Sequence, residues 1–147
     1  LSEDSPAFIA WEPFAAKAEA SGVAVPLLLS EDIWAEHPCC VVGTSNSFLE
    51  SNPEIVQKVV NIHKRAEEWI INNPTEAIEI AIDWLEMDEG IVETAFERII
   101  YSYELNRTGI ERYLDFLIDE DIVTLEPSEV DTYLDEFINT TFIEHAP

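Results

Sequence analysis

The pattern of apolar and polar residues divides the chain into a first third with short apolar runs and a remainder with helical periodicity. Residues 14–20 are rich in alanine and predict a short helix, which Gly22 closes. Residues 30–37 are polar and predict a loop. Three continuous apolar runs are short enough to be buried strands, and they cover residues 8–13, 23–29 and 39–42. We therefore expect this part of the chain to be β-rich with one helix.

From residue 46 onward, apolar residues recur every three or four positions, which is the spacing of helices that bury one face. Asn52-Pro53 predicts the start of a long amphipathic helix. Asn73-Pro74 ends that helix and begins the next, with Asn73 as the expected N-cap. Further helices are expected after Asp88, after a capping box formed by Thr108 and Glu111, and around residues 130–138. The sequence thus predicts about five helices after the β-rich part.

The apolar stripes of these helices also carry larger side chains that are expected to be buried. His63 lies on the stripe of the long helix, where a histidine is more often a satisfied core residue than a ligand. Trp69 and Trp84 have the spacing of core residues on the same and the following helix. All three are therefore expected to serve packing.

The charge balance is the unusual part of the composition. The 147 residues include 31 Asp and Glu but only 7 Lys and Arg, which leaves a formal net charge of -24. Such a field repels phosphate backbones and argues against a nucleic-acid partner. The carboxylates are spread through every predicted helix, which favours a solvated acidic surface, as in adaptation to high salt, over a dedicated sink for cations.

The first predicted strand ends in Trp11, Glu12 and Pro13. A strand that ends on an indole and a carboxylate presents both at the carboxyl edge of a sheet, where open α/β folds bind ligands. The alternative is an ordinary core strand followed by proline at the first position of a helix. Indole supplies a flat apolar wall, and the carboxylate supplies an acceptor for an amine, a hydroxyl or an amide.

His37, Cys39 and Cys40 are the sharpest group by chemical type, because imidazole and thiolate are metal ligands. Consecutive residues on a strand point to opposite faces, so the two cysteines are not expected to share one ion. Adjacent cysteines also rarely form a disulfide with each other. The favoured interpretation is two small buried residues in a strand. No catalytic motif, metal or cofactor is predicted from the sequence.

Several segments in order resemble the later part of the substrate-binding proteins of nitrate, sulfonate, taurine and bicarbonate type ABC transporters. The resembling segments are residues 10–14, 28–34, 37–42, 48–53, 73–77 and 113–118. The resemblance implies the helix-rich C-terminal part of a two-lobed α/β fold of the periplasmic-binding-protein-like type 2 class. In that fold a small ligand is held between the lobes.

The resemblance also implies a division of the chain. Residues 1–29 correspond to the end of the second lobe as strand, helix and strand, residues 30–43 to a hinge or return strand, and residues 44–147 to the C-terminal helical part of the first lobe. The N-terminal half of such a protein, with its signal or lipid anchor, is expected to lie outside this sequence. Without that half, sheet edges of this fragment would lack their partner strands. A second copy could cover them, so the fragment is expected to form a homodimer.

The implied function is the extracytoplasmic solute-binding component of an ABC importer, periplasmic or lipid-anchored on the outer face of the cell membrane. Its expected partners are a small polar solute, such as nitrate, a sulfonate, bicarbonate or a pyrimidine, and the permease. Membrane contact is expected only through the missing anchor, and no cofactor is expected. The candidate ligand-binding residues are Trp11, Glu12, Pro13, His37, Cys39 and Cys40.

Two alternatives of other classes stay open. Pyrimidine-synthesising relatives share this architecture and use a cysteine-rich segment, so an enzyme or metal-binding protein could use His37, Cys39 and Cys40. A helical protein-interaction domain would bind no small molecule. Neither alternative has a motif of its own in the sequence.

Overall fold

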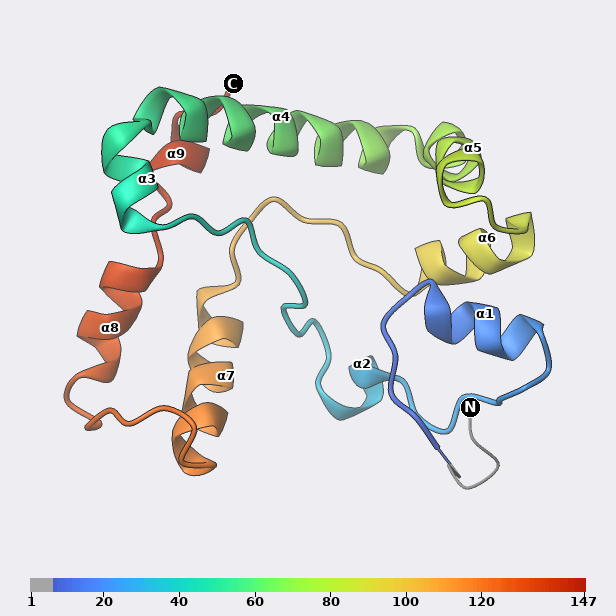
Figure 1. The fold of residues 1–147 in the computed structure, drawn as a ribbon, viewed down its shortest axis with the longest axis horizontal. Helices are drawn as coiled ribbons and strands as arrows, with labels where there is room; N and C mark the ends of the chain where they lie inside the picture. Colours follow the sequence, from blue (N-terminus) through green and yellow to red (C-terminus); the bar gives the residue numbers. More distant parts are fainter. Residues whose placement is uncertain (1–6) are drawn as a thin grey trace. The chain divides into compact units, whose positions relative to one another are not determined.

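A computed structural model describes residues 7–147, and within that range all regular structure is helical (Figure 1). The long helix after residue 52 and the short helix at residues 14–20 were both expected. The helices are α1 Phe14–Ala20, α2 Ser30–Ile33, α3 Asn46–Ser51, α4 Pro53–Asn72, α5 Pro74–Leu85, α6 Glu89–Glu97, α7 Arg107–Asp119, α8 Val130–Phe137 and α9 Thr141–Glu144.

The three predicted strands are absent from the described range, so the expected β-rich first third was wrong. Residues 8–11, 23–29 and 39–42 carry no strand hydrogen bonding. Apolar side chains in the first two of these segments are instead exposed, among them Ile9, Val25 and Leu27. A strand is stable only when a neighbouring strand satisfies its backbone groups, and an apolar run by itself supplies no such neighbour.

The short helix α1 has the bounds that its sequence predicted, and Gly22 ends it as expected. Gly22 has a φ of 71°, and the N–H groups of Gly22 and Val23 donate to the carbonyl groups of Glu19 and Ala18. This is the Schellman arrangement, which favours glycine at the left-handed position. The expected loop at residues 30–37 contains a helical turn, α2, because Asp32 Oδ2 accepts a hydrogen bond from the Leu29 N–H at 2.9 Å.

The five expected later helices, α4 to α8, occur where the periodicity placed them, whereas the short helices α3 and α9 were not expected. Two caps also differ from the prediction. Pro74 occupies the first turn of α5, and the Asn73 side chain makes no cap hydrogen bond. The expected capping box of Thr108 and Glu111 was also wrong, because α7 begins one residue before Thr108. Its N-cap is Asn106, whose Oδ1 accepts a hydrogen bond from the Gly109 N–H at 2.9 Å.

The described chain divides into two compact units. The first unit combines the described part of Leu1–Ile33 with Ile70–Tyr101, and the second unit combines Trp34–Trp69 with Ser102–Pro147. Each unit therefore contains two stretches that are distant in the sequence. The predicted division into residues 1–29, 30–43 and 44–147 stays a prediction.

The core of the first unit is small and is made by α6. Both α1 and α5 pack against α6, and the buried side chains of Ala16, Ile91 and Ala95 meet there with Met87 beside them. The expected burial of Trp84 on α5 was wrong, because its side chain is 82% exposed. Among the described residues α5 packs against α6, and the periodicity identified an apolar stripe wider than the face that is covered there.

In the second unit, the C-terminal segment lies along α4 (Figure 1). Gln57 Nε2 donates to the carbonyl group of Phe142 at 2.8 Å, and Lys64 Nζ donates to that of Ala146 at 2.9 Å. His63 is not a core residue as expected: its side chain is exposed, and Nε2 lies 3.0 Å from Glu67 Oε1, one turn later. The most buried large side chain of this unit is Leu134 on α8.

The few basic residues join segments that are far apart in the sequence. Within residues 7–147, contacts of this kind are made by four of the seven Lys and Arg side chains. Within their own units, Lys64 binds the carbonyl group of Ala146, Arg98 binds Glu12 and Glu19, Arg107 binds Asp135, and Arg112 lies over the ring of Trp34. In an acidic chain, attraction to a scarce cation thus connects stretches that local periodicity does not.

Candidate functional site

The turn that precedes α1 carries three of the predicted site residues in the first unit. Trp11 exposes 75% of its surface. Glu12 is largely buried, with 11% of its side chain exposed, and a cis peptide bond joins it to Pro13. The indole is therefore available to a ligand, whereas the neighbouring carboxylate points into the protein.

The Glu12 carboxylate is already engaged by groups of its own unit. Its Oε2 accepts a hydrogen bond from the Ala16 N–H at 2.9 Å, which satisfies a free donor in the first turn of α1. Its Oε1 lies 3.1 Å from Nη1 of Arg98, which follows the end of α6. Glu12 thus serves as a local cap and as one half of an ion pair.

Arg98 is the residue of this site that sequence reasoning missed. Its Nη2 also lies 2.7 Å from Glu19 Oε2, so one guanidinium binds two carboxylates of the α1 segment. Hydrogen bonding to Glu19 and Glu12 raises the pKa of Arg98 above its ordinary value, against a smaller opposing effect of burial. The signal in the sequence was the scarcity of basic residues, which makes any single arginine a candidate counter-ion.

A small apolar cavity of about 150 Å³ lies beside Pro13 in the same unit. Its walls come from the turn before α1, from α5 and from α6 with the segment that follows it. The lining residues are Pro13, Ala81, Leu85, Val92, Ala95, Phe96, Ile99 and Tyr101. Together the turn and the cavity offer an exposed indole, an ion-paired carboxylate and an apolar hollow, which suit the binding of a small flat molecule.

The other predicted site residues lie in the second unit. His37 Nδ1 lies 3.0 Å from the carbonyl oxygen of Trp34, and the two rings are 6.1 Å apart. The side chain of Asn106 donates to the carbonyl group of Glu36 at 3.2 Å. The segment that leads to the cysteines is therefore attached to the start of α7.

Cys39 and Cys40 do not have the surroundings that the sequence suggested. Both are exposed, so the expected burial in a strand was wrong. Their Sγ atoms lie 3.7 Å apart, because the segment is not a strand and does not send the two side chains to opposite faces. The hydrogen bond with Cys40, partial burial and the charge of Cys40 raise the pKa of Cys39 above its ordinary value.

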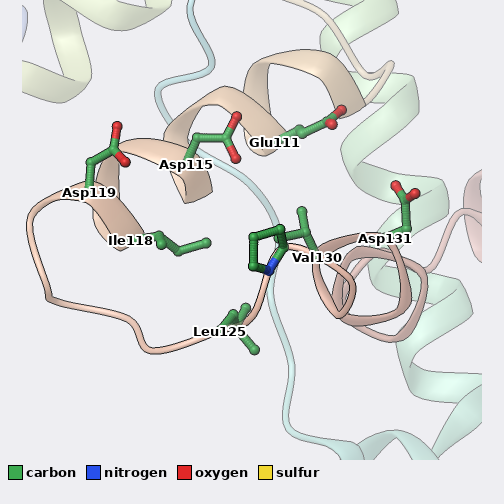
Figure 2. A pocket seen from close by; sticks show the side chains of 8 residues that line it. Glu111, Asp115, Ile118, Asp119, Leu125, Val130 and Asp131 are labelled. Atoms are coloured by element: carbon green, nitrogen blue, oxygen red, sulfur yellow. The ribbon is translucent and has the colours of Figure 1, made fainter.

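A hollow in the second unit was not anticipated. It has a volume of about 470 Å³ and lies between α7, the loop after it and the start of α8 (Figure 2). Glu111, Asp115 and Asp119 follow one another at four-residue steps along α7, and Asp131 comes from α8. Apolar side chains complete the hollow, namely Ile118, Leu125, Pro127 and Val130. The four-residue spacing of the carboxylates was the available signal. Such a lining repels anions.

The structure therefore collects the predicted residues in two places. Trp11, Glu12 and Pro13 are together in the first unit, and His37, Cys39 and Cys40 are near one another in sequence in the second. In the part of the chain that the structure covers, no group of three or more His, Cys, Asp or Glu side chains could hold a metal ion. No helix between residues 7 and 147 has both the length and the apolarity needed to cross a membrane.

Comparison with known proteins identifies one family. Residues 2–86 match the NMT1-like family, and this stretch is more than half of the chain. No curated protein and no solved structure matches the chain. All six predicted site residues fall within the matched stretch, whereas the acidic hollow beside α7 lies outside it.

Proposed function

We propose that this chain, which belongs to the NMT1-like family, is part of the extracytoplasmic solute-binding component of an ABC importer. The family is part of the periplasmic-binding-protein-like superfamily to which nitrate, sulfonate and taurine binding proteins also belong. The observation that carries the proposal is the family match over residues 2–86, which includes the turn at Trp11. The partners are a small polar solute and the permease that receives it.

The ligand contact that we propose centres on Trp11. Its indole is exposed, while the other two residues of the same turn are held within the unit. Glu12 contacts Arg98 and the Ala16 N–H group, and Pro13 lines the apolar cavity. An exposed indole on an anchored turn suits stacking against a planar solute, since little side-chain entropy is lost on binding. His37, Cys39 and Cys40 belong to the second unit, and we propose ligand contact for them separately.

The charges around the turn indicate the class of solute. One guanidinium, from Arg98, faces two carboxylates, from Glu12 and Glu19, which leaves one negative charge. That charge disfavours nitrate and sulfonates and favours a neutral or amino-bearing solute. Among the solutes of this superfamily and its relatives, an aminopyrimidine combines a planar ring with amino donors, and it is our first choice.

Thermal unfolding of the chain with separate additions of nitrate, taurine, bicarbonate and an aminopyrimidine tests the proposal. A ligand that binds the folded state stabilises it by about 2.7 kcal/mol at a hundredfold excess over Kd. We expect the aminopyrimidine to raise Tm and the anions to raise it less. Trp11→Ala should reduce the shift, because the stacking surface is removed.

Trp84→Ala is the matched control, because Trp84 is similarly exposed in the same unit but does not line the cavity beside Pro13. The ligand-induced shift in Trp84→Ala should equal that of the unchanged chain. An equal loss in both variants would assign the effect to general destabilisation. No shift with any of the four compounds would contradict solute binding by this chain.

A further inference from the structure

We propose that Cys39 and Cys40 form a two-thiol site for organic compounds of trivalent arsenic. The two Sγ atoms lie 3.7 Å apart, and both side chains are exposed. Two sulfur atoms this close can both bond to one small thiophilic atom whose bonds meet near a right angle. A linear two-coordinate ion would require them farther apart. The adjacent cysteines therefore act as one chelating unit.

The segment that presents the thiols is held in place by its own unit. His37 Nδ1 lies 3.0 Å from the Trp34 carbonyl oxygen, and the Asn106 side chain donates to the Glu36 carbonyl group at 3.2 Å. Pro38, directly before the pair, packs so closely on α7 that a Cβ at Gly109 would lie 2.7 Å from its Cδ. Thiol groups whose positions are fixed before binding lose less conformational entropy when the ligand binds.

The protons on the thiols favour an oxide of arsenic over a metal cation. The raised pKa of Cys39 favours the protonated form of its thiol, whereas a metal ion binds the thiolate. An organic arsenic(III) oxide consumes such protons: two As–S bonds form, the As=O bond breaks, and the oxygen leaves as water with both thiol protons. Arsenic stays trivalent and both sulfur atoms keep their oxidation state, so the step requires no oxidant or reductant.

The number of protein ligands selects the organic form. Trivalent arsenic makes three bonds, and a mono-organic arsenical already uses one of them for carbon. The two cysteine sulfur atoms then supply the remaining two bonds of the arsenic atom. In the part of the chain that the structure describes, no third His, Cys, Asp or Glu side chain joins the pair to make a metal-holding group. Zinc, which takes three or four protein ligands, is a poorer fit.

Binding of phenylarsine oxide to the reduced chain tests the site, read by intact-protein mass spectrometry and by titration of free thiols. We expect one phenylarsenic group per chain, loss of both free thiols, and release by a dithiol but not by an equal concentration of a monothiol. In Cys39→Ser and in Cys40→Ser, the apparent affinity should fall by about 100-fold or more, because the second bond no longer forms within one molecule.

Three outcomes would overturn the site: no adduct, two phenylarsenic groups on one chain, or equal affinity in the unchanged chain and a single variant. Circular dichroism checks that the variants keep their helices, which is expected for exposed side chains. The unchanged chain blocked with N-ethylmaleimide supplies a second comparison that needs no substitution. It should form no adduct, and an adduct on the blocked chain would place the arsenic elsewhere.

Discussion

Arg98 joins Glu12, 86 residues earlier in the chain, through a contact of 3.1 Å between Nη1 and Oε1. Its second terminal nitrogen, Nη2, reaches Glu19 near the other end of α1 at 2.7 Å. One side chain that follows α6 therefore fixes both ends of a seven-residue helix. The turn that carries Trp11 depends on this arrangement, because Glu12 is its middle residue.

Arg98→Ala is expected to destabilise the first unit by about 1–3 kcal/mol, because the largely buried Glu12 carboxylate loses its charged partner. Urea unfolding followed by circular dichroism measures the loss. Lys17→Ala removes an exposed cation from α1 in the same unit and should change the stability by less than about 0.5 kcal/mol. Equal losses in the two variants would mean that overall charge, and not the pair, sets the stability.

Gly109→Ala is expected to destabilise the second unit by about 1–3 kcal/mol, since overpacking displaces neighbouring groups. The new Cβ would lie 2.7 Å from Pro38 Cδ and 3.0 Å from Asn106 Cγ. Gly90→Ala is the control: it is also a helical glycine, but no atom lies within 4 Å of its Cβ position. That change should be neutral or stabilise by up to about 1 kcal/mol. If Gly90→Ala lost as much stability as Gly109→Ala, the loss at Gly109 could not be assigned to the close approach of Pro38.

The reactivity of Cys39 is expected to increase when Cys40 is replaced by alanine. The neighbouring thiol raises the pKa of Cys39, so at a given pH near neutrality less of it is the reactive thiolate. Cys40→Ala removes the hydrogen bond and the charge, lowers that pKa and increases the thiolate fraction. Iodoacetamide labelling, followed by mass spectrometry, should be faster at Cys39 in the variant. The difference should vanish at high pH, and a slower reaction in the variant would refute it.

The melting temperature is expected to rise with salt concentration. The chain has a net charge of -24, so its carboxylates repel one another. The screening length over which this repulsion acts grows as ionic strength falls, to about 30 Å at 0.01 M. Calorimetry across a series of sodium chloride concentrations measures the effect. Exchange of sodium for potassium chloride at equal ionic strength is the control, and it should leave the trend unchanged. A melting temperature independent of salt would show that the acidic side chains are too dispersed to matter.

The helices were the predictable part of this fold because their signals are local. Asn52-Pro53 marks the start of α4, and the apolar spacing after it continues for the whole helix. Gly22 likewise marks the end of α1 through its own backbone preference. Asn106 was missed as a cap because Thr108, two residues later, has an equally suitable side chain. Local sequence therefore identified the element and left its first residue open.

The strands and the site contacts were not predictable in the same way. An apolar run such as residues 23–29 is compatible with a strand, but whether one forms depends on a partner elsewhere. The prediction that Cys39 and Cys40 point to opposite faces was wrong because it assumed a strand, whereas their Sγ atoms lie 3.7 Å apart. Arg98 and Glu12 are 86 residues apart, and no spacing rule connects them. The sequence identified the chemical groups near the turn but not the group that holds them.

The scarcity of basic residues also has a consequence for which substitutions the chain tolerates. A carboxylate lost from the surface is one of 31 and relieves repulsion, so most such changes should be nearly neutral. By contrast, Arg98 and Arg112 each contact a residue that is distant in the sequence within their own unit. A mutational scan should therefore find the chain permissive at its exposed acidic positions and less tolerant at these two arginines.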